Sequence, residues 1–313
     1  MLPTPWRYLV PPDNASRATL TSEEALALAK DKLMHHQLFT STIHHDVYST
    51  IDPSSPELTQ VGRVVLITEA TSPIAAEHAR YFAKAGARAI ILTSRRMENL
   101  EALRSELATK YPSTEVGAAY CSFTLEEEVA HLLGNAISKF GSLDVIISCA
   151  APTPSFKKIG ESDMQEWWRD LETGVKPLFM LSRFAANLTG TPVTLINVTS
   201  VTGLETIPTR SNYAIGQSVG CQHPNIRAFN LHPGYVAGDG QAGRLESTKR
   251  DTPTLSAGVS LYLTTPQADF LRGRFMSANW DIADLEERKE EIVGQNLLTT
   301  YLRTNVGPGG HLT

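Results

Sequence analysis

The chain has 313 residues, of which 42% are hydrophobic and 19% charged, a composition typical of a globular protein and not of a disordered one. Because 28 lysines and arginines stand against 33 aspartates and glutamates, the net charge is -5 at pH 7, and the basic excess that nucleic acid binding needs is absent. No stretch reaches the roughly 18 apolar residues of a membrane span. The 3 cysteines form no Cys-x-x-Cys pair, so we expect neither a disulfide framework nor a thiolate metal site. Together these features predict a cytoplasmic protein.

The first part of the chain, residues 1–60, is punctuated by proline and serine and predicts an N-terminal arm. One helix is expected in it, over Ser22–Leu33, since a serine can cap it and two glutamates follow in its first turn. The arm also holds His35, His36 and the run His44-His45-Asp46, and imidazoles with a carboxylate are a ligand set for zinc. Their spacing fixes no coordination geometry, so we predict a packing or solvated role and no metal site.

Beyond Gly62, continuously apolar runs alternate with amphipathic stretches. The apolar runs predict strands buried on both faces, and the stretches between them predict helices. This alternation is typical of a doubly wound parallel α/β sheet, here over residues 61–285, followed by a C-terminal helix and tail over 286–313. Such a sheet binds its ligand at the carboxyl ends of the strands. The predicted strands are 63–68, 88–93, 115–121, 143–149, 193–200 and 226–232, and the predicted helices are 74–85, 98–111, 125–140 and 163–188.

A serine and a tyrosine are placed by these elements at the ligand crevice. Ser200 ends one predicted buried strand, and Tyr213 opens the helix that follows. In these residues the chain resembles the short-chain dehydrogenase/reductase family, which has a Rossmann-like fold. In that family the serine orients a substrate carbonyl and the tyrosine transfers a proton while a nicotinamide moves hydride.

The resemblance extends from Gly62 to about Arg303. Its tail, with part of the arm, is similar to the branch common in fungal secondary-metabolite pathways. The stretches that carry it are Leu143-Asp144, Ile196–Gly203, His232–Val236, the tail Pro266–Asp281 and the arm segment Phe39–Asp46.

The resemblance implies catalytic roles for Tyr213, Ser200 and Gln217. A phenol with a pKa near 10 is a good acid for the alkoxide that forms in carbonyl reduction, but a poor base at neutral pH. The family lowers this pKa with a lysine one helical turn after the tyrosine, where this chain has Gln217. An amide can hydrogen-bond a ribose but carries no charge, so we expect reduction to survive better than oxidation.

The family's phosphate-binding turn, Thr-Gly-x-x-x-Gly-x-Gly, reads Thr68-Glu-Ala-Thr-Ser-Pro-Ile-Ala75 in this chain. Its glycines let the backbone and a phosphate approach closely at a helix N-terminus. Glu69, Pro73 and Ala75 replace all of them, and the carboxylate repels a pyrophosphate while the proline removes an amide donor. The groups that remain for a phosphate are the helix N-terminus and the hydroxyls of Thr68, Thr71 and Ser72.

The residues after the second predicted strand indicate which dinucleotide would bind. Ser94 stands where an NAD enzyme places an acid for the ribose 2′-hydroxyl, and Arg95 and Arg96 follow it. Two guanidinium groups without that acid favour a 2′-phosphate, so we predict NADP(H) as the cofactor. A solvated helix start is the alternative role for the two arginines. The other cofactor-binding positions that the resemblance implies are Ile74, Ser122, Cys149, Ala150, Val236, Tyr213 and Gln217.

Several positions depart from the family pattern. Ser122 replaces an adenine-contacting aspartate, Ser148-Cys-Ala-Ala151 replaces Asn-Asn-Ala-Gly, and Gly174 replaces an asparagine that supports a proton relay. Cys149 has no histidine that the sequence identifies as its base, so we interpret it as a small apolar filler. The span from Tyr213 to Ile226 is also shorter than in the family. Because the helix in this span helps to build the dimer interface of relatives, its shortness counts against the homo-oligomer that the resemblance implies.

Three hypotheses for the function follow. The first is an NADP(H)-dependent oxidoreductase that acts on a small molecule, an intermediate of secondary metabolism. The second is an enzyme of the same fold without redox activity, an isomerase, cyclase or dehydratase in which Tyr213 or Ser200 acts as the acid. The third is a catalytically silent partner of an active relative.

Overall fold

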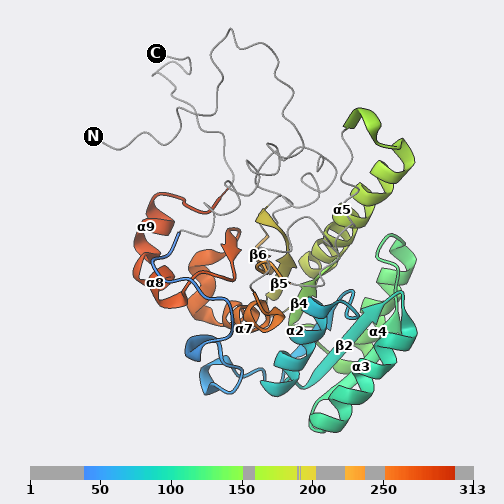
Figure 1. Cartoon of the computed structure of the whole chain (residues 1–313). Coiled ribbons are helices and arrows are strands. Elements are labelled where there is room, and N and C mark those ends of the chain that lie inside the picture. Colours follow the sequence, from blue (N-terminus) through green and yellow to red (C-terminus); the bar gives the residue numbers. More distant parts are fainter. Residues whose placement is uncertain are drawn as a thin grey trace.

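The computed structural model describes residues 39–150, 159–188, 190, 192–201, 223–236 and 251–299. They contain a sheet whose strands are β1 (Val64–Ile67), β2 (Ala89–Ser94), β3 (Glu115–Tyr120), β4 (Val145–Ser148), β5 (Val193–Val198), β6 (Ile226–His232) and β7 (Phe275–Ser277). All neighbouring strands are parallel, in the order β3-β2-β1-β4-β5-β6-β7 (Figure 1). The order reverses between β1 and β4, so the predicted doubly wound α/β fold is confirmed.

The helices of the described residues are α2 (Pro73–Lys84), α3 (Met97–Lys110), α4 (Glu126–Phe140), α5 (Met164–Ala186), α7 (Pro253–Leu263), α8 (Ile282–Glu287) and α9 (Lys289–Gly294), with short 3-10 helices η1 (Ser49–Ile51), η2 (Pro56–Leu58), η3 (Ile159–Glu161) and η6 (Pro266–Leu271). Ser72 and Asp163 cap α2 and α5, because each side chain accepts a hydrogen bond from an N–H of the first turn. α4 ends at Gly141, whose φ of 76° is accessible to glycine. Over the described residues, these helices are all too short or too polar to cross a membrane.

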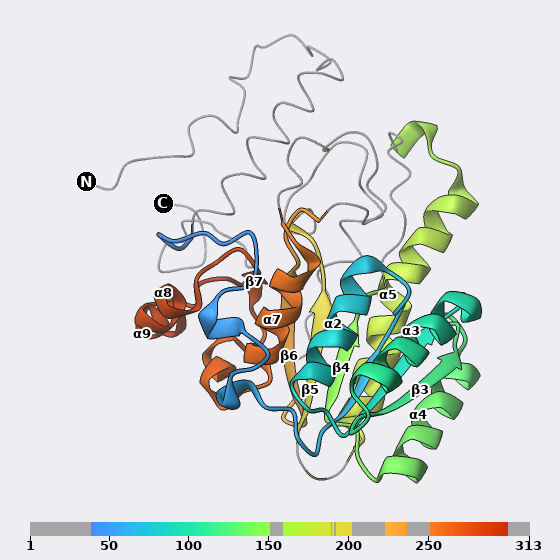
Figure 2. The ribbon, with the colours of Figure 1, turned by 60° about the horizontal axis from the view of Figure 1, so that its bottom comes forward.

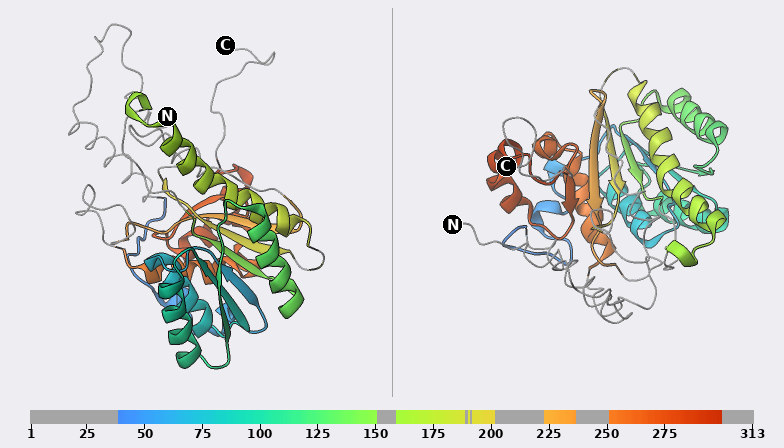
Figure 3. Two further views of the ribbon diagram at one scale, coloured as in Figure 1. Left: turned by 90° about the vertical axis from the view of Figure 1, so that its right-hand side faces the viewer. Right: turned by 90° about the horizontal axis from the view of Figure 1, so that it is seen from above.

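Helices cover both faces of the sheet, which is why the central strands are apolar throughout. In β1, Val65 and Ile67 pack with α2, α3 and α7, whereas Val64 and Leu66 pack with α4 and α5. Every residue of β1, β2, β4 and β5 is buried, while the edge strand β3 is partly exposed. Figure 2 shows α2 beside α7, and the view from above in Figure 3 shows α4 and α5 on the face opposite α8 and α9.

The arm, described from Phe39 onward, packs against the C-terminal part of the chain. Ile43 forms an antiparallel bridge with Trp280, and the rings of Phe39 and Trp280 are 5.1 Å apart. Ile51 is fully buried in the same core as β1 and α7. The arm therefore belongs to the folded domain. The predicted helix over Ser22–Leu33 lies outside the described residues.

The C-terminal region has two short helices where the sequence predicts one. α8 and α9 meet at Arg288, whose φ of -93° and ψ of 10° interrupt the helix. Glu286 accepts a hydrogen bond from the Tyr262 hydroxyl at 2.8 Å, and Arg288 forms an ion pair with Glu291. The charged run over these helices is thus anchored to the core on one side.

His78 links α2 to α7 and is completely buried. Its Nδ1–H donates to the Ile74 carbonyl at 2.8 Å, so Nε2 accepts from the Ser260 hydroxyl at 2.9 Å. Burial lowers the pKa of the imidazole from 6.5 to about 4. The neutral form is therefore the one that the folded protein accommodates.

We expect the free energy of unfolding to fall as the pH decreases, because the unfolded chain binds a proton to His78 near its ordinary pKa and the folded chain does not. The stabilisation is complete above that ordinary pKa and is lost progressively toward the lowered one. Between pH 7.5 and pH 5 the loss attributable to this group is about 2 kcal/mol. Urea unfolding of the wild type and of His78→Gln at both pH values measures it. A variant with the same pH dependence as the wild type would contradict the assignment.

Two helical glycines have opposite surroundings. A Cβ at Gly258 in α7 would lie 2.6 Å from the Ile51 carbonyl oxygen, whereas a Cβ at Gly134 in α4 would meet no atom within 4 Å. We expect Gly258→Ala to lower the free energy of unfolding by about 1–3 kcal/mol, since α7 must move away from the arm. Gly134→Ala should raise it by about 0.5–1 kcal/mol through helix propensity. Chemical unfolding checks both, and shifts of equal sign would rule out the close contact.

Candidate functional site

The carboxyl ends of the parallel strands meet at one edge of the sheet, on either side of the point where the strand order reverses. Thr68 directly follows β1, Cys149 directly follows β4, and Ser200 comes just after β5. β5 and β6 stay paired up to this edge, since the Thr199 N–H donates to the Leu231 carbonyl at 2.8 Å. This edge is the candidate active site.

The loop from β1 to α2 is tied to both neighbouring strands. Thr68 is fully buried, and its hydroxyl oxygen accepts a hydrogen bond from the Cys149 N–H at 2.9 Å. The Ala70 N–H donates to the Thr93 carbonyl at 2.9 Å. The loop therefore has a fixed position between β4 and β2, at the place where the family binds a pyrophosphate.

Glu69 lies in this loop with a backbone conformation that favours glycine. Its φ is 48°, in the left-handed region, which costs a residue with a side chain roughly 1 kcal/mol. Glu69 replaces the first glycine of the family's turn, so the loop retains a glycine-like backbone while carrying a carboxylate. That carboxylate forms an ion pair with Arg95, with 3.7 Å between Oε1 and Nε, and the Arg95 side chain is 61% exposed.

Arg96 reaches the same loop from the end of β2. Its guanidinium donates to the Thr71 hydroxyl at 3.2 Å, and its backbone N–H donates to the Ser94 hydroxyl oxygen at 3.1 Å. The hydroxyls of Ser94 and Thr71 are themselves 3.0 Å apart. The structure thus brings the predicted cofactor residues of the two loops together. Because two guanidinium groups accompany one carboxylate here, the cluster keeps a positive net charge.

Comparison with known proteins finds one family over this site. The family model of the short chain dehydrogenases matches residues 63–216. The short chain dehydrogenase citE of Monascus ruber is 30% identical over 282 residues, which cover 84% of this chain and 95% of the relative. The chain belongs to the short-chain dehydrogenase family. The short chain dehydrogenase andI of Emericella variicolor is 25% identical, over 90% of this chain and 99% of the relative.

Solved structures of short-chain dehydrogenases share the fold. A short chain dehydrogenase from Mycobacterium smegmatis has a TM-score of 0.62 at 20% identity, covering 71% of this chain and 93% of that one. A dehydrogenase/reductase from Sinorhizobium meliloti has a TM-score of 0.63 at 19% identity, covering 71% and 95%. At these identities the likeness concerns the fold alone.

In this short-chain dehydrogenase, Ser200 is buried at the carboxyl edge of the sheet, with 6% of its surface exposed. Ile74 lies in the first turn of α2 and packs against the core. The other two predicted catalytic residues, Tyr213 and Gln217, lie outside the described residues, so their roles stay predictions.

Three further predicted cofactor positions lie at the ends of β3 and β4. The Ser122 N–H donates to the Glu128 carboxylate at 2.7 Å, and its hydroxyl lies 2.9 Å from that of Thr124. These contacts join the end of β3 to the first turn of α4.

The other two positions, Cys149 and Ala150, follow β4. Ala150 is buried, and burial together with the charge of Glu69 raises the pKa of the Cys149 thiol. A thiol that stays protonated agrees with the predicted filler role.

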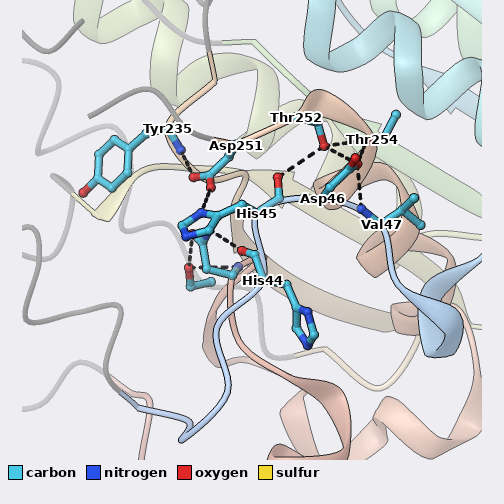
Figure 4. A network of polar contacts seen from close by, with 10 residues as sticks. His44, His45, Asp46, Val47, Tyr235, Asp251, Thr252 and Thr254 are labelled. Atoms are coloured by element: carbon cyan, nitrogen blue, oxygen red, sulfur yellow. Dashed lines mark hydrogen bonds and ion pairs between the residues drawn. The ribbon is translucent and has the colours of Figure 1, made fainter. Parts of the chain in front are cut away.

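Val236, the last predicted cofactor position, is buried and forms a parallel bridge with Asp251. Sequence reasoning assigned no role to Asp251. Its side chain is only 1% exposed, and it accepts a hydrogen bond from the Tyr235 N–H at 2.6 Å. The close-up in Figure 4 shows this carboxylate between Tyr235 and the arm residue His45. No local pattern around Asp251 could have indicated a partner so far away in the chain.

The histidines of the arm bind two different carboxylates. His44 Nε2 lies 2.7 Å from Asp281, and its ring stacks on that of Tyr48 at 3.6 Å. His45 Nδ1 lies 2.5 Å from Asp251. The described part of the chain contains no group of three or more potential metal ligands. Through their carboxylate partners, His44 and His45 pack the arm against the rest of the domain, while His35 and His36 lie outside the described residues. That none of these histidines binds a metal stays a prediction.

Proposed function

We propose that this short-chain dehydrogenase is an NADP(H)-dependent oxidoreductase that reduces a carbonyl, or oxidises the alcohol, of a secondary-metabolite intermediate. Membership of the family supports redox chemistry with a nicotinamide, which supplies or accepts the hydride when bound. The observation that carries the choice of cofactor is the positive cluster of Arg95 and Arg96 at the end of β2. The relatives named above come from fungi, which supports a fungal metabolite as substrate.

The charge at the end of β2 suits a phosphorylated ribose. Ser94 is buried and carries no charge, so position 94 lacks the acid that binds a ribose 2′-hydroxyl. Arg95 is largely exposed and pairs with the Glu69 carboxylate at 3.7 Å, so a 2′-phosphate competes with Glu69 for it, while Arg96 is held against Thr71. A guanidinium binds a phosphate through two parallel hydrogen bonds, and the pair without an acid favours NADP(H) over NAD(H).

The turn beside this cluster retains part of the pyrophosphate-binding capacity of the family. Pro73 has no N–H, and the Ala75 N–H already donates to the Ser72 hydroxyl oxygen at 3.3 Å. Among the described residues, the N–H groups of Thr71 and Ile74 donate to no protein acceptor, so they remain as donors at the start of α2. The Glu69 carboxylate opposes a phosphate, but Arg95 offsets its charge. These residues fit a dinucleotide phosphate with fewer donors than a glycine-rich turn offers.

Ser200 and Tyr213 carry the chemistry in this proposal. The Ser200 hydroxyl donates a hydrogen bond to the substrate carbonyl oxygen, and the Tyr213 phenol gives its proton to the developing alkoxide. Gln217 supplies an amide for hydrogen bonding but lacks the positive charge of the family's lysine. A phenol donates a proton readily and accepts one poorly at neutral pH when no such charge assists it, which favours the reductive direction.

The second candidate function is an enzyme without redox activity, and Glu69 is the observation that favours it. A carboxylate in the phosphate-binding turn and the loss of its glycines both weaken dinucleotide binding. Ser200 and Tyr213 would then serve as acids in an isomerisation, cyclisation or dehydration. Calorimetric titration with NADPH separates the two functions, since the second requires no dinucleotide.

We expect the wild type to bind NADPH with micromolar affinity and NADH more weakly. Arg95→Ala should weaken NADPH binding by about tenfold and NADH binding less, because only NADPH carries the 2′-phosphate, whereas loss of the charge that offsets Glu69 affects both dinucleotides. Glu69→Gln should strengthen binding of NADPH by roughly threefold, since it removes a nearby like charge in an exposed setting. Isothermal titration calorimetry measures all of these affinities.

Arg104→Ala is the matched control, because this arginine pairs with Glu101 on the surface of α3. It should leave both affinities at their wild-type values. Equal losses of NADPH and NADH affinity in Arg95→Ala would exclude the 2′-phosphate role. A wild type that does not bind NADPH would contradict the oxidoreductase proposal.

We expect Tyr213→Phe to lower the rate of NADPH-dependent carbonyl reduction by at least about a hundredfold, because it removes the general acid. NADPH should still bind, with somewhat lower affinity, since the Tyr213 hydroxyl is only one of many predicted cofactor contacts. The measurement is single-turnover oxidation of bound NADPH with a ketone substrate. Tyr120→Phe is the control, since Tyr120 is 55% exposed on β3, and it should keep the full rate. An unchanged rate in Tyr213→Phe would show that another group donates the proton.

A further inference from the structure

The chain leaves β6 through a short segment that a buried carboxylate holds in place. Asp251 Oδ2 accepts the Tyr235 N–H at 2.6 Å, and the Asp251 N–H donates to the Tyr235 carbonyl at 3.3 Å. Val236 forms a bridge with Asp251. Asp251 thus binds the end of this segment both through its side chain and through its backbone.

Gly234 allows this carboxylate to lie so close to the backbone. Its φ is +90°, and a Cβ at this position would lie 2.6 Å from Asp251 Oδ2. Any other residue would push the carboxylate away from the Tyr235 N–H. The geometry of the β6 exit, Gly234 to Val236, therefore depends on Asp251 remaining where it is.

His45 of the arm supplies the other hydrogen bond to this carboxylate. Its Nδ1–H donates to Asp251 Oδ1 at 2.5 Å, and the imidazole is 46% exposed while the Asp251 side chain is 1% exposed. A carboxylate withdrawn from water needs donors for both oxygens. With Tyr235 on one oxygen and His45 on the other, the Asp251 carboxylate has a donor at each end (Figure 4).

The arm is held at this position by the start of α7. The Thr252 N–H donates to the His45 carbonyl at 2.9 Å, and the Asp46 carboxylate accepts from the hydroxyls of Thr252 and Thr254 at 2.6 and 2.7 Å. These hydroxyls lower the pKa of Asp46 below its usual value. The backbone of His45 is thus fixed by its neighbours, so its hydrogen bond to Asp251 holds the carboxylate in place.

The β6 exit lies next to the catalytic serine. β5 and β6 are in parallel register, with Val198 opposite Leu231, and the Thr199 N–H still donates to Leu231 beyond the end of β5. Ser200 and Gly234 therefore leave the same edge of the sheet on neighbouring strands. A displacement of the β6 exit changes the wall of the crevice beside Ser200.

We propose that His45 is a positioning residue for the substrate: through Asp251 it fixes the backbone of Gly234 to Val236 beside Ser200, and so sets the affinity for the small-molecule substrate. This inference rests on the proposed reductase function for its kinetic consequence. It assigns to the arm a direct part in the active site. Because His45 acts through the crevice wall and not on the reacting groups, its loss changes KM more than kcat.

The test compares two substitutions whose side chains have the same branched shape and the same number of heavy atoms. His45→Leu removes the donor to Asp251, whereas His45→Asn retains an N–H donor. His44→Leu is the matched control, since His44 is the neighbouring histidine and is also bound to a carboxylate, that of Asp281 at the start of α8. The readouts are amide hydrogen exchange over Gly234 to Val236 and NADPH-dependent reduction of a panel of small ketones.

We expect His45→Leu to speed exchange of the Tyr235 amide by about tenfold or more, because its acceptor loses one of two donors. KM for the ketone should rise by about tenfold, with kcat within about threefold of the wild type. His45→Asn should restore both values toward the wild type, and His44→Leu should leave both unchanged. Because Val236 is a predicted cofactor position, KM is measured at saturating NADPH in every variant, so that a change in cofactor affinity does not enter it.

Wild-type exchange in His45→Leu, or the same change in His44→Leu, would overturn the inference. A wild type that reduces ketones, with KM unaffected by His45→Leu, would overturn it as well. A wild type that reduces no ketone of the panel with NADPH counts against the proposed function instead, and the exchange of the Tyr235 amide then still decides whether His45 positions the β6 exit. Asp251→Asn, which keeps the size of the side chain, should speed the same exchange if His45→Leu fails to fold.

Discussion

Burial of a parallel sheet on both faces is the constraint on which the rest of this structure depends. Every residue of β1, β2, β4 and β5 is covered by helices, and parallel pairing brings all the carboxyl ends to one edge. Polar groups can then do chemistry only where the chain leaves the strands. Thr68, Ser94, Cys149, Ser200 and Val236 all lie at or just beyond strand ends, which is why residues so distant in sequence come to one edge of the sheet.

The turn after β1 shows how a site can keep its backbone while changing its chemistry. Glu69 adopts a φ of 48°, a conformation that a glycine would adopt without strain, because the loop is tied to β4 through Thr68 and to β2 through Ala70. The new carboxylate lies beside Arg95, so its repulsion of a phosphate is partly cancelled. In the proposed function, the balance between this charge and the two arginines sets the affinity for the dinucleotide.

The N-terminal arm connects the C-terminal elements to the crevice. Trp280 and Asp281 hold it on one side through Ile43 and His44, while Asp251 and the start of α7 hold it on the other through His45 and Asp46. A buried carboxylate without hydrogen-bond donors costs folding free energy, and the arm supplies one of the donors to Asp251. The arm and the exit of β6 are therefore held in fixed positions relative to each other.

The sequence by itself indicated the family and the chain order of the strands β1 to β6 and of the helices α2 to α5, because apolar runs and capping residues are local signals: the strand predicted over 226–232 is β6, and the helix predicted over 163–188 is α5 within two residues at each end. It did not predict α7 or β7, and the roles of Ser200, Arg95, Arg96, Tyr213 and Gln217 stay predictions. Only the tertiary structure decided the pairs Glu69 with Arg95 and His45 with Asp251. His45 and Asp251 are separated by 206 positions, and no local pattern specifies which distant carboxylate an imidazole meets, since folding of the whole sheet brings them together.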